Sequence, residues 1–141
     1  MTIVLDASVA AKWCVRAGEP HERQALDLLR RHLAGEVEFL VPDLFWPEIG
    51  NVLWKAARQN RCTPEQALES IRLLRAQELP TFSSVKLMEP TFAIAQRFDR
   101  SFYDSVYVAL ALANQATLIT ADEKLANATA AYLPVKWLGA V

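Results

Sequence analysis

Residues 2–6 read Thr-Ile-Val-Leu-Asp, a short apolar run that ends in a carboxylate. Because no polar residue alternates within the run, it predicts a strand buried on both faces, as in a parallel sheet. Predicted helices and further strands alternate along the rest of the chain. This alternation predicts an α/β fold with a central, mostly parallel sheet. No repeat or linker divides the chain, so we expect residues 1–141 to form a single domain.

The other expected elements follow from the hydrophobic period and from turn residues. Helices are expected at residues 8–15, 21–33, 43–60, 89–99 and 101–114, with two more opening at the capping box Thr63-Pro64-Glu65-Gln66 and at Asp122. Strands are expected at residues 37–41, 83–88, 117–120 and 135–138. Ser8 is the expected N-cap of the first helix.

The composition excludes several classes of protein. Hydrophobic residues make up 52% of the 141 and charged residues 22%, with only 4 Gly and 7 Pro, which excludes disorder and low complexity. The longest uncharged run is polar at one end, and the N-terminus lacks a signal-peptide pattern, so we expect a cytoplasmic protein without a membrane segment. Cys14 and Cys62 fit neither a disulfide framework nor a zinc cluster.

The charge balance limits how the protein can bind nucleic acid. Fifteen Lys and Arg against sixteen Asp and Glu give a net charge of -1. This balance argues against binding of nucleic acid by charge alone. It leaves open a nuclease whose acidic pocket is neutralised by metal ions.

Four carboxylates stand where predicted strands end or predicted helices begin. Asp6 follows the first strand, and Asp122 lies two residues after the strand at 117–120. Glu48 and Asp104 lie in the first turns of their helices. Since ligands of a parallel sheet bind beyond the carboxyl ends of its strands, these four side chains are able to converge there.

Each of these positions also has a purely structural explanation. Acidic residues stabilise helix N-termini, so Asp6 and Asp122 are possible N-caps and Asp104 a capping-box residue paired with Ser101. Asp104 fits this explanation least well. It is the only charged residue between Ser101 and Ala121, in a helix that is apolar all round and therefore predicted to be buried. A buried carboxylate must be paired or bound to a metal.

No cation within these motifs is an obvious partner for the carboxylates. Lys12 and Lys124 are the nearest in sequence, and either is able to form an ordinary ion pair. Carboxylates that converge without cations repel one another. A hard divalent ion, Mg²⁺ or Mn²⁺, would relieve this repulsion because it binds carboxylate oxygens and waters.

Four motifs, in order along the chain, resemble those of a known family. They read Leu5-Asp6-Ala7-Ser8-Val9, Glu48-Ile-Gly-Asn51-Val-Leu53, Tyr103-Asp104-Ser-Val-Tyr107-Val-Ala109-Leu-Ala111 and Leu118-Ile-Thr120-Ala-Asp122. The chain resembles the PIN-domain family, and more closely the VapC-type toxins of prokaryotic toxin–antitoxin pairs. The motifs span residues 5–122, and the whole chain has the family's length.

The resemblance implies a three-layer α/β/α fold and a metal-dependent endoribonuclease that leaves a 3′-hydroxyl and a 5′-phosphate. The implied catalytic and metal-binding residues are Asp6, Glu48, Asp104 and Asp122, with Mg²⁺ or Mn²⁺ as cofactor. Glu48 either completes the metal's coordination or orients the attacking water. The implied substrate-positioning residues are Ser8, Asn51 and Thr120.

The resemblance also implies partners. They are an RNA substrate, a second copy in a homodimer, and an antitoxin whose tail lies in a groove near the active site, with DNA contacted only through the antitoxin. Trp54 projects opposite Ile49 and Ala56 on the helical wheel, so it is a candidate anchor for the protein partner. The alternative, in which another helix covers Trp54, stays open.

Other functions fit the same sequence less well. A phosphotransfer enzyme with Asp6 as nucleophile would carry a second Asp two positions later, where Ser8 stands. A receiver-type domain would need adjacent acids near the first strand and a Lys after a late strand. A PIN-like interaction module without catalytic activity is the main alternative, since a fold does not imply a function.

Overall fold

The computed structural model describes residues 1–15 and 18–141. Its centre is a five-stranded sheet with the strand order β3-β2-β1-β4-β5, and every neighbouring pair of strands is parallel. The strands are β1 (Thr2–Leu5), β2 (Glu38–Pro42), β3 (Thr81–Phe82), β4 (Thr117–Thr120) and β5 (Val135–Trp137). The predicted α/β fold with a central parallel sheet is confirmed.

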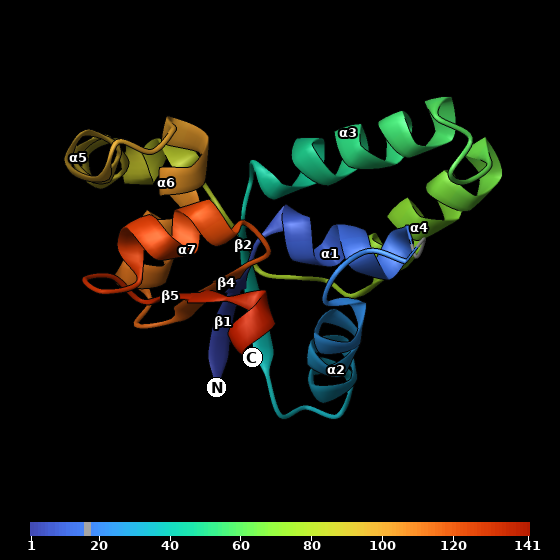
Figure 1. Ribbon diagram of the computed structural model, residues 1–141, viewed down its shortest axis with the longest axis horizontal. Helices are drawn as coiled ribbons and strands as arrows, with labels where there is room; N and C mark the ends of the chain where they lie inside the picture. The colour runs from blue at the N-terminus through green and yellow to red at the C-terminus, as the bar shows by residue number, and fades with distance from the viewer. Residues whose placement is uncertain (16–17) are drawn as a thin grey trace.

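Helices cover both faces of the sheet (Figure 1). One face carries α1 (Ala7–Cys14), α2 (Glu22–Leu33), α3 (Phe45–Arg58) and α4 (Pro64–Ala76), and the other carries α5 (Met88–Phe98), α6 (Phe102–Ala113) and α7 (Glu123–Thr129). Two short 3-10 helices, η1 (Ser84–Leu87) and η2 (Leu138–Ala140), complete the described elements. The three-layer α/β/α arrangement is therefore confirmed.

The first strand shows why its sequence has no polar alternation. Ile3 and Leu5 point to one face and pack with the core cluster formed by α1 to α4. Val4 points to the other face and packs with side chains of α6 and α7. All three side chains are fully buried. A polar residue at any of these positions would lose its water without gaining a partner.

The order of the strands creates a crevice at the carboxyl edge of the sheet. The chain leaves β1 towards β2 through helices on one face, and it leaves β4 towards β5 through α7 on the other face. The direction of winding therefore changes between the adjacent strands β1 and β4. In open parallel sheets such a switch point is where ligands bind. Asp6 and Asp122 follow these two strands and begin the helices on either side of the crevice.

The predicted strand at residues 83–88 is wrong. The edge strand β3 contains only Thr81 and Phe82, and the following residues form the 3-10 helix η1. Asp43 Oδ2 accepts hydrogen bonds from the backbone nitrogen of Ser84 at 3.0 Å and from its hydroxyl at 3.2 Å. These long-range bonds turn the chain away from the sheet, and sequence alone does not show them.

The helix starts are close to those expected, with one correction. Asp6, not Ser8, is the N-cap of α1, because its side chain accepts a hydrogen bond from the Ser8 backbone nitrogen. The capping box at Thr63 is confirmed, with both of its hydrogen bonds to Gln66 present. Cys14 and Cys62 are free cysteines and half-buried.

Within residues 1–15 and 18–141, no helix has both the length and the apolar character needed to cross a bilayer.

Candidate active site

Asp6 lies at the floor of the crevice and is almost completely buried. In the pairing of β1 with β4, Leu5 stands opposite Ile119, which brings the following residues Asp6 and Thr120 together. The Thr120 hydroxyl donates to Asp6 Oδ2 at 2.7 Å, and the Ser8 backbone nitrogen donates to Asp6 Oδ1 at 3.3 Å. Asp6 is therefore both a helix cap and a carboxylate fixed at the switch point.

The Thr120 hydroxyl also links Asp6 to Asp122, the second acid of the crevice. It accepts a hydrogen bond at 3.0 Å from the backbone nitrogen of Asp122, whose Oδ1 in turn caps α7 by accepting from the Leu125 nitrogen at 3.2 Å. The Ser8 hydroxyl accepts from the Ala121 nitrogen at 3.1 Å. The structural explanation of Asp6 and Asp122 as helix caps is thus correct, and the same hydrogen bonds hold both carboxylates beside the crevice.

Glu48 is positioned by a residue from the opposite layer. The Tyr107 hydroxyl of α6 donates to Glu48 Oε2 of α3 at 3.0 Å. Tyr107 is only 2% exposed, so its hydroxyl has this bond in place of water. The contact joins helices on opposite faces of the sheet across the crevice.

Asp104 lies in the first turn of the same helix as Tyr107. Its backbone nitrogen donates to the Ser101 hydroxyl at 3.1 Å, as the expected cap requires. The expectation that the whole helix is buried is wrong at this end and also at the other, where Leu112 and Ala113 are exposed. Residues 105–111 are buried, but Asp104 is only half-buried and Tyr103 is exposed, because the first turn of α6 faces the crevice and not the core.

Burial and mutual repulsion disfavour the charged forms of these acids. Burial raises the pKa of Asp6, and the negative charge of Asp104 adds to the rise. Burial raises the pKa of Glu48 from 4.5 to about 7, with further contributions from Asp6 and Asp104. Burial, together with the charge of Asp122, raises the pKa of Asp104. Each of the four carboxylates therefore lies within electrostatic range of at least one of the others.

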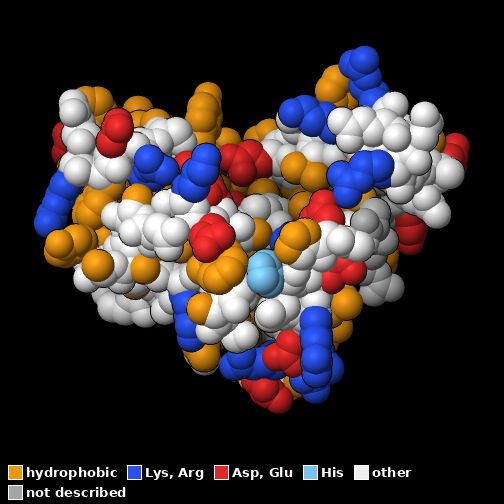
Figure 2. All heavy atoms as spheres, in the orientation of Figure 1, with side chains coloured by type: hydrophobic (Ala, Val, Ile, Leu, Met, Phe, Trp, Pro, Cys, Tyr) orange, Lys and Arg blue, Asp and Glu red, His pale blue; other side chains and the backbone are white. Residues whose placement is uncertain are grey.

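The repulsion is not relieved by an ion pair within the described part of the chain, where no Lys or Arg lies within bonding distance of these carboxylates. Lys12, one of the two expected candidates, instead pairs with Glu19 at 3.2 Å. Figure 2 shows acidic side chains in the notch between the two helical layers, with Lys and Arg side chains on both flanks. The crevice thus has a negative centre that no described ion pair neutralises, with basic side chains on its flanks.

The donor set fits a hard divalent cation better than zinc. No three described His, Cys, Asp or Glu side chains are placed to hold one ion between them. Mg²⁺ needs no such cage, since it usually keeps several waters and takes one or two protein carboxylates. The neighbouring pairs Asp6 with Asp104, and Asp104 with Asp122, offer carboxylate oxygens of this kind. All the available donors are oxygens, the ligands that Mg²⁺ and Mn²⁺ prefer.

The remaining predicted residues lie along α3, outside the acidic cluster. Asn51 is exposed one turn beyond Glu48. Trp54 is 53% exposed, which confirms that it faces outward, and the Arg58 guanidinium lies 5.1 Å from the centre of its ring. No helix of the described residues covers Trp54, so that alternative is wrong.

Sequence reasoning did not assign a role to Tyr107. A signal was present, because a tyrosine in an otherwise apolar, buried helix needs a hydrogen-bond partner for its hydroxyl. Its spacing of three residues from Asp104 places both side chains on neighbouring parts of one helix face. Only the tertiary structure shows that the partner is Glu48.

Fold and crevice together define an α/β protein with a carboxylate-rich centre at the switch point of a parallel sheet. The PIN domain family model matches residues 3–131. Ribonuclease VapC3 of Pyrobaculum aerophilum is 31% identical over 129 residues, which cover 90% of this chain and 94% of the relative. The chain therefore belongs to the PIN domain family, and within that family to the VapC ribonucleases, which confirms the resemblance.

Solved structures agree with the fold. VapC20 of Mycobacterium tuberculosis, described as a sarcin-ricin loop cleaving toxin, superposes with a TM-score of 0.66 at 16% identity, covering 90% of this chain and 95% of that one. A chain in the structure of VapBC2 from Rickettsia felis, bound to a DNA fragment from their promoter, gives 0.64 at 13% identity, covering 97% and 98%.

The raised pKa of Glu48 predicts how the stability of the metal-free protein depends on pH. The native state holds its proton up to about pH 7, whereas the unfolded chain releases it near 4.5. Between these values the unfolded state binds fewer protons, so the free energy of unfolding should fall as pH rises. In Glu48→Gln, the decrease in the free energy of unfolding over this pH range should be smaller by about 1 to 2 kcal/mol. This value already allows for solvent screening at a partly exposed site.

Denaturant unfolding in EDTA from pH 4 to 8 measures this dependence. Glu65→Gln, at an exposed position of α4, is the matched control for removal of a carboxylate. An unchanged pH slope in Glu48→Gln would contradict the assignment.

The hydrogen bond from Tyr107 gives a second prediction. It stabilises the charged form of Glu48, so Tyr107→Phe should raise the pKa of Glu48 further above about 7 while the ring still fills its place in the core. Carbon-13 NMR titration of the Glu48 carboxyl in metal-free protein measures the shift. A pKa equal to or lower than that of the wild type would show that the bond does not hold the carboxylate.

Proposed function

We propose that this protein is a divalent-metal-dependent endoribonuclease and the toxin of a type II toxin–antitoxin pair. The observation that carries the proposal is the set of four carboxylates at the switch point, held close together by the fold without an ion pair in the described residues to neutralise them. Maintaining such repulsion costs stability, and a bound cation would relieve it. The names of the relatives, which are ribonucleases, support the same activity.

The residues take distinct roles in this mechanism. Asp6, Asp104 and Asp122 would hold Mg²⁺ or Mn²⁺, directly or through waters. When bound, such an ion makes water a better nucleophile at neutral pH and stabilises the negative charge that develops on the phosphate. Glu48, held by Tyr107, either completes the ion's coordination or orients the attacking water. Attack of that water on phosphorus displaces the 3′-oxygen and leaves a 3′-hydroxyl and a 5′-phosphate.

The hydroxyl groups of Thr120 and Ser8 mainly hold the carboxylates in position. Thr120 is fully buried, and its hydroxyl already donates to Asp6 and accepts from the Asp122 nitrogen. The Ser8 hydroxyl accepts from the Ala121 nitrogen. We therefore assign to Thr120 and Ser8 the positioning of Asp6 and Asp122, and leave direct contact with the substrate to exposed residues such as Asn51.

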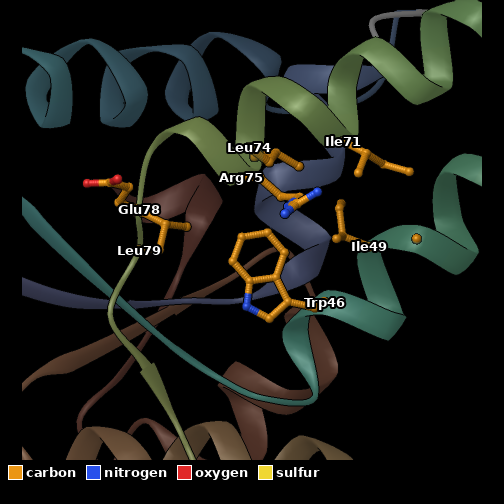
Figure 3. A pocket seen from close by; sticks show the side chains of 8 residues that line it. Trp46, Ile49, Ile71, Leu74, Arg75, Glu78 and Leu79 are labelled. Atoms are coloured by element: carbon orange, nitrogen blue, oxygen red, sulfur yellow. The ribbon is translucent and has the colours of Figure 1, made fainter.

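A groove between α3 and α4 is suited to the antitoxin (Figure 3). It has a volume of about 460 Å³ and a mainly apolar wall, with lining residues Trp46, Ile49, Gly50, Ile71, Leu74, Arg75, Glu78 and Leu79. Trp54 follows Gly50 by one turn of α3, and the exposed Leu68 precedes Ile71 by about one turn of α4. Both extend the apolar surface beyond the groove. An antitoxin segment with apolar side chains would cover this surface.

The other assignments depend on the same proposal. The structure of VapBC2 contains a toxin–antitoxin pair together with promoter DNA. By analogy we propose that this chain contacts DNA only through its antitoxin, that it forms a homodimer, and that it acts on RNA in the cytoplasm.

Replacement of Asp104 tests the catalytic proposal. Asp104→Asn should reduce Mg²⁺-dependent cleavage of RNA by at least about 100-fold, since it removes the carboxylate that both proposed metal-binding pairs share. The metal-free fold should be as stable as the wild type or more stable, because repulsion with Asp122 decreases. Cleavage of an RNA panel with Mg²⁺, Mn²⁺ or EDTA, together with thermal unfolding, measures both effects.

Asp99→Asn is the matched control. Asp99 is exposed at the C-cap of α5 in a left-handed conformation that Asn also accepts, so this variant should cleave like the wild type. A fully active Asp104→Asn protein would overturn the site. If the wild type neither cleaves RNA nor binds divalent ions, the non-catalytic interaction module becomes the better assignment.

Replacement of Trp54 tests the partner surface. Trp54→Ala should weaken binding of the antitoxin by about 10-fold or more, the effect of losing an aromatic anchor, and leave cleavage by the free toxin unchanged. Isothermal titration with the cognate antitoxin measures the affinity. Leu33→Ala, which truncates an exposed apolar side chain of α2, is the control. Equal affinity in the Trp54→Ala and wild-type proteins would remove this residue from the interface.

A further inference from the structure

Tyr103 is an exposed aromatic side chain beside the proposed catalytic centre. It lies in the first turn of α6, immediately before Asp104, and is 64% exposed. Within residues 1–15 and 18–141, its side chain takes part in no hydrogen bond, aromatic pair or cation–π contact. The fold therefore leaves most of the ring available to another molecule.

The helix geometry places this ring at the mouth of the crevice. Residues four apart lie one above the other on a helix, so Tyr103 stands one turn above Tyr107 on the same side of α6. The Tyr107 hydroxyl reaches across the crevice to Glu48 on α3. The ring of Tyr103 thus stands on the side of α6 that faces α3, one turn further from the core.

A cation stands close to the same turn. Arg100 lies near enough to Asp104 to offset part of the rise that burial causes in the pKa of that carboxyl. The Arg100 Nε atom donates only to the neighbouring Asp99 carbonyl, and in the described part of the chain Arg100 forms no ion pair with a carboxylate. The mouth of the crevice therefore offers a free positive charge and a free aromatic face within a few residues.

These two groups match the two repeating parts of a single-stranded nucleic acid, the phosphate and the base. A base inside an A-form duplex is stacked between its neighbours, and a protein ring cannot reach its face. An aromatic ring beside a phosphodiester-cleaving site therefore favours an unpaired nucleotide. A protein partner would be expected to bury several exposed apolar residues together, but Tyr103 lies in the chain between the half-buried Phe102 and the charged Asp104.

We propose that Tyr103 stacks on the base of the unpaired nucleotide next to the scissile phosphate. Arg100 binds a neighbouring phosphate. This inference deepens the proposed ribonuclease function and depends on it for the position of the scissile bond.

Kinetics with a defined substrate test the stacking role. On an RNA hairpin that the wild type cuts at one mapped site in its loop, Tyr103→Ala should raise KM by about 5- to 100-fold and leave kcat within about 2-fold, since the ring binds substrate and is not involved in the chemistry. Tyr103→Phe keeps the ring and should behave like the wild type. Tyr132→Ala removes a 73% exposed tyrosine on the turn before β5 and is the control.

Modified substrates identify the stacked nucleotide. Substrates that lack the base at one position beside the cut are tested in turn. At one of these positions, removal of the base should raise the KM of the wild-type protein as much as Tyr103→Ala does. Combining that substrate with Tyr103→Ala should raise the KM no further. In the Asp122→Asn background, which keeps a side chain able to cap α7, 2-aminopurine at that position should lose fluorescence on binding. Tyr103→Ala should restore the fluorescence.

The outcomes separate the two proposals. If the wild type cleaves RNA but Tyr103→Ala has the same KM as the wild type, the stacking role is wrong and the ribonuclease proposal stands. The same conclusion follows if the wild type cleaves duplex RNA as well as it cleaves the loop. If Tyr103→Ala instead changes only antitoxin affinity or oligomeric state, Tyr103 belongs to a protein interface and the proposal is overturned. If the wild type cleaves no RNA, the ribonuclease proposal fails, and unquenched 2-aminopurine would also refute the stacking role.

Discussion

The hydrogen bond from Thr120 to Asp6 is the interaction on which the rest of the site depends. It is buried, it joins residues that are 114 positions apart in sequence, and it exists because β1 and β4 are parallel neighbours in a fixed register. A shift of one strand by one residue would turn its side chain to the opposite face and separate the two groups. The same Thr120 hydroxyl accepts from the Asp122 nitrogen, so the strand pairing places two of the four acids at once.

The acidic centre opposes folding, and the sheet and helices offset it. Burial and mutual repulsion raise the pKa of Asp6, Glu48 and Asp104, which means that the charged forms of these acids are destabilised in the native state. The two apolar clusters on opposite faces of the sheet supply the opposing free energy, since each contains side chains that are fully buried. A cluster of acids whose charged forms are destabilised is typical of functional positions, where local stability is sacrificed.

The two helical layers supply different surfaces to the same crevice. The layer of α5 to α7 contributes Asp104, the buried Tyr107 and the exposed Tyr103, all from one helix start. The layer of α1 to α4 contributes Glu48 and, on the far side of α3, the apolar groove. The bond between Tyr107 and Glu48 joins side chains of the two layers at the acidic centre. An occupant of the groove lies against the helix that carries Glu48, so binding there and catalysis share an element.

The sequence by itself determined the fold class and the identity of the four acids. The unbroken apolar run of β1 requires burial on both faces, and this forces a layered parallel sheet. Strand ends and helix starts are local features, so the positions of Asp6, Glu48, Asp104 and Asp122 were visible from capping patterns and hydrophobic period. The short strand β3 and the exposed first turn of α6 were not, because a long-range bond to Asp43 and the position of the crevice decide them. Tertiary structure alone decided which side chains meet: Thr120 with Asp6, Tyr107 with Glu48, and Lys12 with Glu19 and not with the acids. These contacts join residues that only strand order and helix packing bring together, and no local pattern in the chain encodes a distance between such residues.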